Sequence, residues 1–434
     1  MSVGVTGIAL AGCGRVAQSN DARAASGGSG GALLIATAGA EAVSGAPAAG
    51  RSGSDGGTAS ASAGQGGTIN EAGGVGGAVS GAAGVSGTAG VGGASGPSLP
   101  HPYRALQIAT GRYHSCALLE NHQVKCWGRN GYGQLGLGDV VWRGLDQSLM
   151  GDALPFVDLG HGRSAKSISA GRYSTCAILD DDSIKCWGLP VFELSSNFIG
   201  DEPGELSDAL APLALGIGRT AKAVAIGYYD ACVALDDDSF LCGSAGVSPS
   251  HVAAAPDAHL VSMASSNAPI GVFDDGSARY MGTGAAAPTS SYASNVLLAT
   301  GSRDHACFLL QGQKLQCGSS YWPALPAEVP GAVALAISEL GTLCAIVAEG
   351  RVHCWSGNHR DPAWPLAAEG WVEVPLTAPA VQISSAGWEH HCALLSDGAV
   401  ECWSWDTTTT DAVGFDDHAS PVLMPVNLGI WPGP

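Results

Sequence analysis

The sequence predicts an all-β protein: a seven-bladed β-propeller preceded by a disordered tether rich in Gly, Ala and Ser. Three observations predict this fold. Twelve of the thirteen cysteines form six pairs with the same ten-residue separation. Each pair encloses a strand–turn–strand pattern, and seven units of this kind follow one another between residues 101 and 434. Such self-similarity is typical of repeat folds, and seven units with four strand candidates each predict a propeller.

The cysteine pairs are predicted to close β-hairpins. A separation of ten centres each hairpin on one residue, which predicts a three-residue loop whose last residue is left-handed. The two cysteines then lie opposite each other, about 4.5 Å apart between Cα atoms, within reach of a disulfide. The predicted disulfides are Cys116–Cys126, Cys176–Cys186, Cys232–Cys242, Cys307–Cys317, Cys344–Cys354 and Cys392–Cys402.

Zinc sites and buried free thiols are the competing interpretations of these cysteines. Zinc ligands prefer Cys-x2-4-Cys spacing, and no Cys-x-x-Cys occurs in the chain. Free thiols pack as small hydrophobes, but they do not explain why both cysteines are replaced together in the fourth unit, by Ile270 and Tyr280. The paired loss favours disulfides, and disulfides indicate an oxidising compartment.

Residues 1–13 are predicted to be a lipoprotein signal, and residues 14–100 a disordered linker. The sequence Leu-Ala-Gly-Cys that ends at Cys13 resembles the bacterial lipobox, which implies lipidation of that cysteine. The linker is poor in large apolar residues and reaches about 50 Å end to end. We therefore expect an exported protein, anchored in the cell envelope or secreted. The alternative is a chance apolar start on a soluble protein, because no Lys or Arg precedes Arg15.

The charge balance argues against a nucleic-acid partner. The formal net charge is −19, with 19 Lys and Arg against 38 Asp and Glu, whereas nucleic-acid binders carry a basic patch. No apolar run approaches the ~20 residues of a membrane span. We expect a monomer that contacts a membrane only through the lipid anchor.

The most regular unit carries a family resemblance. Its recurring positions are Gly111, His114, Ala117, Leu118, Trp127, Gly128, Asn130, Gly133, Gln134, Leu135 and Gly136. This pattern resembles the regulator of chromosome condensation repeat, and its cysteine-paired form resembles secreted bacterial members. The resemblance spans about 104–429 and implies a propeller. The eukaryotic founder catalyses nucleotide exchange on a small GTPase and binds chromatin, so the resemblance implies an exchange regulator as an alternative function.

Three histidines and several acidic turns are candidate sites. His114, His305 and His390 stand two residues before the first cysteine of their units. One interpretation is a polar, metal-holding ring. The favoured one is hydrogen bonding to backbone of neighbouring blades, because imidazoles on blades one, five and seven are too far apart for one ion. The acidic turns lack the spaced ligands of a calcium loop. We expect no catalytic, metal or cofactor site.

Long insertions in units six, seven, one and two are predicted to form one binding half-rim, because these units are consecutive in a closed ring. The candidate partner-binding residues are Trp142, Phe198, Trp371 and Trp405, since exposed aromatics are typical interface anchors. The alternative is harmless drift of surface loops. Residues 420–429 are predicted to complete the first blade and to bring the ends of the domain together.

The function predicted from these observations is a binding module that recognises a protein or a glycan. The chain contains no recognised catalytic motif. The alternatives are an exchange regulator by descent and a hydrolase or lyase that uses the propeller channel.

Overall fold

The structure is a computed structural model. It describes residues 32–33, 101–144, 147–192, 197–228, 230–253, 258–265, 269–281, 291–302, 305–318, 328–356, 371–387, 390–404 and 423–431. Within these ranges no helix is long and apolar enough to cross a bilayer. Cys13, Trp405 and most of the predicted linker lie outside the described residues.

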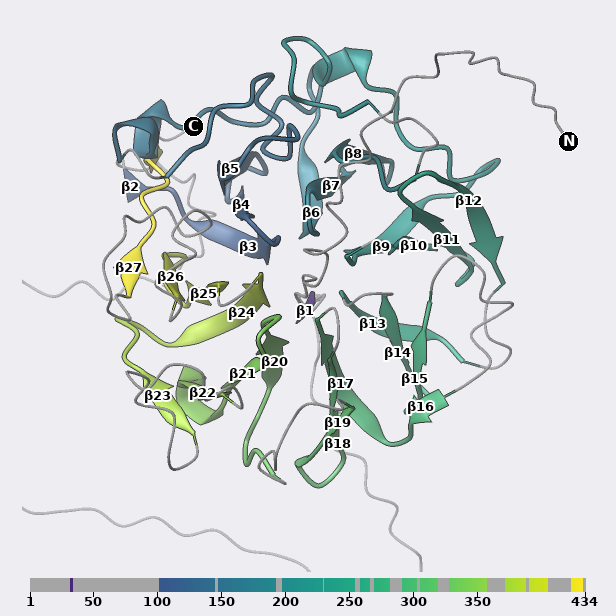
Figure 1. Ribbon diagram of the computed structural model, residues 1–434, viewed down its shortest axis with the longest axis vertical. Coiled ribbons are helices and arrows are strands. Elements are labelled where there is room, and N and C mark those ends of the chain that lie inside the picture. Colours follow the sequence, from purple (N-terminus) through teal and green to yellow (C-terminus); the bar gives the residue numbers. More distant parts are fainter. Residues whose placement is uncertain are drawn as a thin grey trace, which may run out of the picture. The chain divides into compact units, whose positions relative to one another are not determined.

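Within the described residues, seven antiparallel sheets follow one another along the chain as the blades of a propeller, numbered here one to seven (Figure 1). The first strand of each blade lies nearest the centre and contacts the first strand of the next blade, and blade seven contacts blade one. These innermost strands are β3 (Ala105–Thr110), β6 (Ala165–Ala170), β9 (Ala221–Ile226), β13 (Leu260–Ala264), β17 (Val296–Gly301), β20 (Ala334–Ile337) and β24 (Ala380–Ala386). The predicted all-β propeller is confirmed.

The second and third strands of each blade form its hairpin. The hairpins are β4 (His114–Leu119) with β5 (Val124–Gly128), β7 (Ser174–Leu179) with β8 (Ile184–Gly188), β10 (Asp230–Leu235) with β11 (Phe240–Ser244), β14 (Ile270–Phe273) with β15 (Ala278–Tyr280), β18 (Ala306–Leu310) with β19 (Lys314–Gly318), β21 (Thr342–Ile346) with β22 (Val352–Ser356), and β25 (His390–Leu395) with β26 (Val400–Ser404).

Outer strands and short turns complete the described elements. Fourth strands are β12 (Val247–Val252) in blade three, β16 (Ser291–Ala293) in blade four, β23 (Val372–Val374) in blade six and β27 (Met424–Pro425) in blade seven. Blade four also pairs with β1 (Ala32–Leu33), and β2 (His101–Pro102) pairs with β28 (Ile430–Trp431). The 3-10 turns are η1 (Gln147–Leu149), η2 (Gly151–Ala153), η3 (Ser207–Ala209) and η4 (Ala348–Gly350).

Each predicted cysteine pair forms a disulfide inside its own hairpin. All six bonds join directly opposed residues whose Cα atoms lie 4.0–4.1 Å apart. This short distance is typical of a non-hydrogen-bonded cross-strand pair. Blade four keeps the same register without sulfur, because Ile270 faces Tyr280. The predicted pairing is therefore confirmed for all twelve cysteines.

The left-handed residue that ends a hairpin loop also joins that blade to the next one. His122 and Asp182 have φ angles of 60° and 63°, as the loop prediction requires. The His122 carbonyl accepts a hydrogen bond from the Ala165 amide (2.9 Å), and the Asp182 carbonyl accepts one from Ala221 (2.9 Å). The turn thus fixes both the hairpin and the first residue of the following innermost strand.

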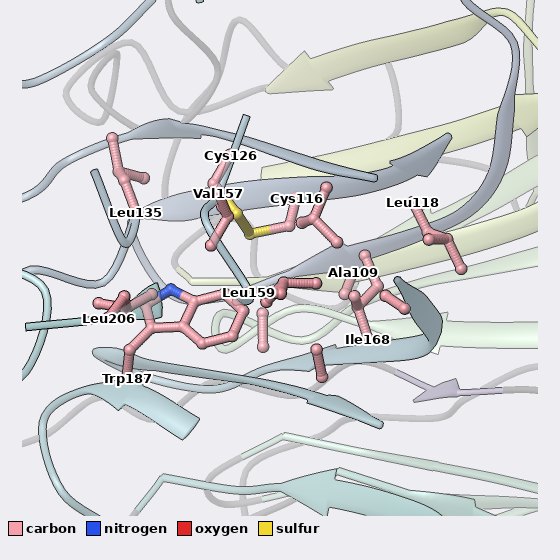
Figure 2. Close-up of a cluster of buried hydrophobic side chains, with 14 of the residues drawn as sticks. Ala109, Cys116, Leu118, Cys126, Leu135, Val157, Leu159, Ile168, Trp187 and Leu206 are labelled. Atoms are coloured by element: carbon pink, nitrogen blue, oxygen red, sulfur yellow. A yellow bond between two sulfur atoms is a disulfide. The ribbon is translucent and has the colours of Figure 1, made fainter. Parts of the chain in front are cut away.

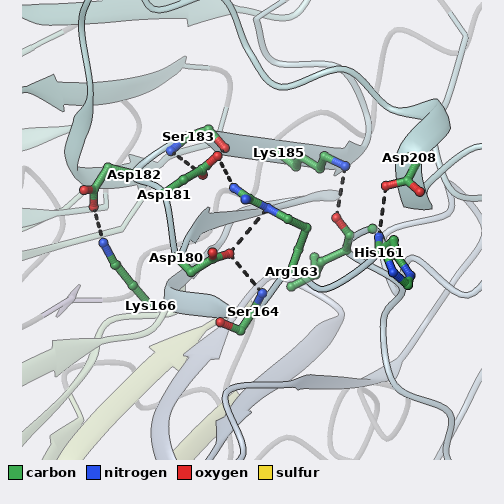
Figure 3. A network of polar contacts seen from close by, with 12 residues as sticks. His161, Arg163, Ser164, Lys166, Asp180, Asp181, Asp182, Ser183, Lys185 and Asp208 are labelled. Carbon is green, nitrogen blue, oxygen red and sulfur yellow. Dashed lines mark hydrogen bonds and ion pairs between the residues drawn. The ribbon is translucent and has the colours of Figure 1, made fainter.

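The acidic turns cap backbone amides and pair with nearby cations (Figure 3). In blade two, Asp180 accepts the Ser164 amide (3.1 Å), and Asp181 accepts the Ser183 amide and hydroxyl. Lys166 pairs with Asp182 at 2.7 Å. Blade three repeats this arrangement with Asp236, Asp237, Asp238, Arg219 and Lys222. These contacts confirm the predicted role as turn residues.

Apolar side chains fill the space between successive blades (Figure 2). Between blades one and two, Trp187 of β8 is buried with Leu135, which follows β5 in blade one. The Trp187 indole N–H donates to the Gln134 carbonyl (3.0 Å), which also accepts the Thr175 hydroxyl (2.9 Å). The Gly-Gln-Leu-Gly motif of the first unit therefore connects blade one to blade two.

The ends of the domain meet, but not by the predicted pairing. β27 pairs with β26, so the segment predicted to complete blade one completes blade seven. The ends are joined instead by β2 and β28, and by the Lys125 amine, which donates to the carbonyls of Gly151 and Leu428 (2.8 Å each). Each fourth strand among the described residues, in blades three, four, six and seven, follows the hairpin of its own blade, which explains the error.

Candidate functional site

The loop between the innermost and second strands places arginine and tyrosine at the same point of neighbouring blades. Blade one has Gly-Arg-Tyr at residues 111–113, and blade two has the same sequence at 171–173. Both loops follow an innermost strand directly. Because consecutive blades are packed side by side, Tyr113 and Tyr173 stack on each other with ring centres 5.7 Å apart and planes within 18°.

This stack extends outward in both directions into the long insertions of blades one and two. On one side, Arg129 lies over Tyr113 (4.6 Å to the ring centre) and over Trp142 (4.9 Å). On the other side, Tyr132 packs against Tyr173 (4.4 Å) and edge-on against Phe198 (4.9 Å). We call this group the aromatic–arginine ladder; its members are Trp142, Arg129, Tyr113, Tyr173, Tyr132 and Phe198.

Two further arginines, Arg172 and Arg112, pack against the tyrosines of the ladder. Arg172 lies over Tyr173 (4.6 Å) and over the buried ring of Tyr228 in blade three (4.1 Å). Arg112 lies over Tyr113 (4.8 Å) and pairs with Glu339 of blade six, with 3.5 Å between Nε and Oε1. Both partners of this ion pair are almost fully buried, and a buried pair of this kind holds its groups in one geometry.

Burial and charge also act on the central tyrosine. Burial raises the pKa of Tyr113, while the positive charges of Arg112 and Arg129 lower it and Glu339 raises it. The net direction is upward, so the phenol stays protonated at neutral pH and its hydroxyl keeps its proton for hydrogen bonding. The ladder thus combines neutral phenol rings with guanidinium groups.

The loops that carry the ladder are tied together by hydrogen bonds. The Asn130 side chain accepts the Leu135 amide (2.9 Å) and donates to Asp139, which pairs with Arg143 at 2.7 Å. The Gly138 amide donates to the Gly200 carbonyl (3.0 Å), which joins the insertion of blade one to that of blade two. The described parts of the two insertions are therefore bonded to each other.

The predicted partner-binding residues lie in different places. Trp142 is 39 % exposed, and Phe198 is half-buried at the other end of the ladder. Trp371 is partly buried against the apolar cluster that contains Leu309 and Leu335 of blades five and six. Trp405 lies outside the described residues. The structure thus joins two of the four predicted residues through side chains that the sequence analysis did not select.

The histidines chosen from the sequence lie inside the blade interfaces. His114 contacts the Thr175 hydroxyl of blade two (2.8 Å), and His390 contacts the Ser115 hydroxyl of blade one (2.6 Å). Neighbouring blades supply the partners, as predicted, but the partners are hydroxyl groups rather than backbone. Burial lowers the pKa of both imidazoles to about 3, which keeps them neutral. His305 is also buried.

Other features of the described residues offer little chemistry. An apolar pocket in blade two is lined by Cys186, Leu189, Pro190, Val191, Phe192, Ile199, Leu210, Ala211 and Leu213. Within the described ranges, no three His, Cys, Asp or Glu side chains are grouped as metal ligands. The aromatic–arginine ladder is the candidate site because it combines partial exposure with several packed planar groups.

Two stretches of the chain, residues 106–134 and 165–192, match the family model for the regulator of chromosome condensation (RCC1) repeat. Blades one and two therefore contain sequences similar to the RCC1 repeat. The matched stretches contain the hairpins of blades one and two and the tyrosines Tyr113, Tyr132 and Tyr173 of the ladder. The two stretches similar to RCC1 repeats therefore position most of the candidate site.

Curated relatives of this chain match over short segments. The ultraviolet-B receptor UVR8 of Arabidopsis thaliana is 35% identical over 88 residues, which cover 20% of this chain and 18% of the receptor. Protein RCC1 of Candida albicans is 31% identical over 99 residues, which cover 20% of this chain and 21% of that protein. The chain thus matches about a fifth of the length of each relative.

Among solved structures, the chain resembles Prp20p of Saccharomyces cerevisiae, a protein described with its binding to Gsp1p and histones. The TM-score is 0.50 at 13% identity, and the match covers 75% of this chain and 87% of Prp20p. A likeness at this identity shows the propeller fold, and function has to be argued from the site itself.

Proposed function

We propose that this chain is an exported binding module that recognises a protein through the aromatic–arginine ladder of blades one and two. The observation that carries the proposal is the continuous stack from Trp142 through Arg129, Tyr113, Tyr173 and Tyr132 to Phe198. Trp, Tyr and Arg are the residues most enriched at the energetic centres of protein interfaces. Their stacking across two blades gives a rigid surface at little entropic cost on binding.

The proposed location is the cell envelope, with a lipid at Cys13 as the anchor, or the medium if the chain is released. Six disulfides support an oxidising compartment, because such bonds are rare in the cytosol. The lipobox-like sequence before Cys13 and the Gly/Ala/Ser-rich residues behind it suit a tethered domain. In this arrangement the ladder would be presented to partners at a distance from the membrane.

Nucleotide exchange and hydrolase or lyase activity stay as alternatives without a specific observation in their favour. The buried histidines at the blade interfaces are neutral and bonded to hydroxyl groups, so they stabilise the ring. Trp371 and Trp405 remain proposed contacts on the rest of the half-rim. A glycan partner would bind the same aromatic faces. The capture experiment described next distinguishes a glycan from a protein partner.

The test compares two variants of one ladder residue in the full chain. Tyr132→Ala removes the ring between Tyr173 and Phe198, whereas Tyr132→Phe keeps it. We expect proteins captured from an envelope fraction by the unchanged chain to be lost with Tyr132→Ala and retained with Tyr132→Phe. For a purified partner, the dissociation constant should rise at least about tenfold, which corresponds to about 1.4 kcal/mol.

Controls separate recognition from folding. Val247→Ala, at an exposed position of β12 in blade three, should leave capture unchanged. The melting temperatures of all variants should agree within about 4 °C, which corresponds to a small change in stability for a domain of this size. Equal capture by Tyr132→Ala and the unchanged chain would remove the ladder as the binding surface. Binding that depends on the ladder but is seen with glycans alone would show that the partner is a glycan and not a protein.

A further inference from the structure

The innermost strand of every blade exposes one residue at the same point, three residues before the residue that faces the first cysteine of the hairpin. The register defines this point: Ala109 faces Cys116 in blade one, and Ala336 faces Cys344 in blade six. In blade four, Ile270 takes the place of the cysteine. The residues at this point, which we call the rim residues, are Leu106, Lys166, Lys222, Val261, Leu297, Val333 and Val381 in blades one to seven.

The rim residues lie on the opposite face of the ring from the aromatic–arginine ladder. The second strand of a blade runs from the loop of Tyr113 or its equivalent to the hairpin turn, so the loop and the turn lie at opposite ends of the blade. The innermost strand begins at the turn end, where the Ala165 amide donates to the His122 carbonyl (2.9 Å). Lys166, the next residue, pairs with Asp182 in the turn of its own blade (2.7 Å). The rim residues therefore encircle the centre of the hairpin-turn face (Figure 1).

Five of the seven rim residues are aliphatic and exposed to water. Their exposed fractions range from 42 to 61 %, and they are five of the eleven exposed large hydrophobic residues in the part of the chain that the structure describes. Exposed aliphatic residues concentrated in this way indicate a contact surface. Their blades, four to seven and one, are consecutive in the closed ring. We call this set the apolar arc; its members are Leu106, Val261, Leu297, Val333 and Val381.

The hairpin turns follow the same division of the ring. In blades two and three, the left-handed turn residue is an aspartate, and it pairs with the rim lysine of its own blade at 2.7 Å. In the five blades of the apolar arc, the equivalent turn residues are His122, Gly276, Gln313, Gly350 and Gly398. The apolar arc therefore carries no acidic group at either position, whereas the charged sector contains matched charges of both signs.

The predicted linker joins the propeller on this same face. The Arg104 amide donates to the Glu120 carboxylate (3.0 Å), and the Glu120 amide donates to the Arg104 carbonyl (2.9 Å), at the start of the hairpin turn of blade one. The next amide, of Ala105, donates to the Gly398 carbonyl in the hairpin turn of blade seven (2.8 Å). The chain thus enters the ring directly before Leu106. A lipid at the other end of the linker would hold the face of the apolar arc toward a membrane, within a reach of about 50 Å.

We propose that the apolar arc docks on a zwitterionic lipid surface, so that the propeller lies on the membrane with the aromatic–arginine ladder directed away from it. This inference rests on the envelope location proposed above, in which the lipid at Cys13 is a first membrane signal. Stable membrane attachment takes two signals. Five exposed aliphatic side chains supply the second one, and the tether raises their effective concentration at the surface.

Charge selects a zwitterionic surface over an anionic one. The chain has a formal net charge of −19, and acidic residues such as Glu120 and Asp397 lie in the hairpin turns of this face. The rim lysines add no net positive charge, because each is paired with an aspartate. An anionic membrane would repel the protein, most strongly at low salt. A neutral headgroup layer meets no such repulsion and leaves the apolar contact in place.

Cosedimentation with large phosphatidylcholine vesicles tests this surface on the full-length chain. Cys13→Ser removes the unpaired thiol, so that neither a lipid nor a disulfide between two copies contributes. We expect the bound fraction to rise with lipid concentration. Val333→Asp, in the middle of the apolar arc, should lower the partition coefficient at least about tenfold, because a carboxylate is costly to remove from water. The matched control is Val247→Asp, at an exposed valine of β12 outside the rim, and it should leave binding unchanged.

Two further measurements sharpen the test. Leu297→Asp, in the neighbouring blade, is an independent second variant and should weaken binding as Val333→Asp does; unchanged melting temperatures show that both variants fold. Replacing part of the phosphatidylcholine by phosphatidylglycerol should weaken binding at low salt, and added salt should restore it.

Absence of binding to phosphatidylcholine vesicles at lipid excess would overturn the proposal, and so would equal binding by the Val333→Asp and Leu297→Asp variants. A dimer that forms without lipid and is lost with Val333→Asp would assign the apolar arc to a second copy instead. Tyr132→Ala, in the ladder, should leave vesicle binding unchanged. Vesicle binding and partner capture therefore depend on different residues, and failure of this proposal is distinguishable from failure of the proposed function.

Discussion

At the scale of single residues, the position before the second cysteine shows how one side chain can hold a blade to its connecting segment. Lys185 donates to the carbonyls of Leu159 and Ser207 (3.0 and 2.6 Å), as Lys125 does at the junction of the chain ends. Burial lowers the pKa of both lysines. In blade seven Glu401 takes this position and accepts hydrogen bonds from Thr377 instead. In blades one, two and seven this position therefore supplies a polar group that satisfies nearby backbone groups.

Replacing Lys125 by Met tests this role at the closure of the ring. The substitution keeps the apolar stem but removes both hydrogen bonds of an amine that is 2 % exposed. Two buried carbonyls lose their partner, so we expect the free energy of unfolding to fall by about 2–4 kcal/mol. Guanidinium denaturation measures the change. Lys166→Met, which removes a half-exposed ion pair, should cost less than about 1 kcal/mol; equal losses would contradict the closure role.

At the scale of elements, the disulfide hairpin is the repeated unit, and blade four shows that its register does not depend on sulfur. Ile270 and Tyr280 are paired as the cysteines are elsewhere. Ile270 and the neighbouring Val272 pack into an apolar cluster that spans blades four and five. Side-chain packing thus fixes the hairpin register in blade four. A disulfide reinforces the same register in the other six blades. This is why the spacing survives the loss of both thiols.

The double substitution Ile270→Cys and Tyr280→Cys should create a seventh disulfide. The two positions already face each other in the register that carries a bond in the other blades, so little movement is needed. Protein produced under oxidising conditions should show no free thiol from this pair, and peptide mapping without reductant should link residues 270 and 280. Ile270→Cys alone provides the control, with one free thiol. Two free thiols in the double variant would show that the register differs from the paired one.

At the scale of the whole molecule, buried neutral histidines connect the blades and make the ring sensitive to acid. His391 contacts the Ser385 hydroxyl (2.7 Å) and stacks on Trp403 (5.6 Å), in addition to the contacts of His114 and His390 across blade interfaces. Burial lowers the pKa of all three imidazoles to about 3. The folded protein therefore excludes protons that the unfolded chain takes up below about 6.5.

Stability should be complete above pH 6.5 and should fall as the pH drops from 6.5 toward 3. Near pH 5 the unfolded state would bind up to three more protons than the folded state, which gives a slope of up to about 4 kcal/mol per pH unit. Denaturation curves at pH 7, 6 and 5 measure this slope. His114→Gln, which keeps a polar group near Thr175, should reduce the slope by about one third. A pH-independent stability between 7 and 5 would contradict the buried neutral state.

The sequence anticipated the local features of this protein because they depend on residues close together in the chain. The ten-residue spacing determines the hairpin, its loop and its disulfide. The ladder was anticipated only in part. Trp142 and Phe198 were selected as aromatic residues in long insertions, but the stack of Tyr113 on Tyr173 joins residues of different repeats. The Gly-Arg-Tyr sequence shared by the two loops was the sequence feature that could have indicated this stack. It indicates the stack only once the two loops are known to be adjacent.

By itself, the sequence determined the repeat, the hairpins, the six cysteine pairs and the acidic turns, because each is set by contacts within about ten residues. Only the tertiary structure decided which strands meet across long separations. The segment around Met424 is apolar enough for either end of the ring, and its pairing with blade seven depends on the register with β26. The ladder likewise exists because consecutive blades pack side by side, a condition that no single unit encodes.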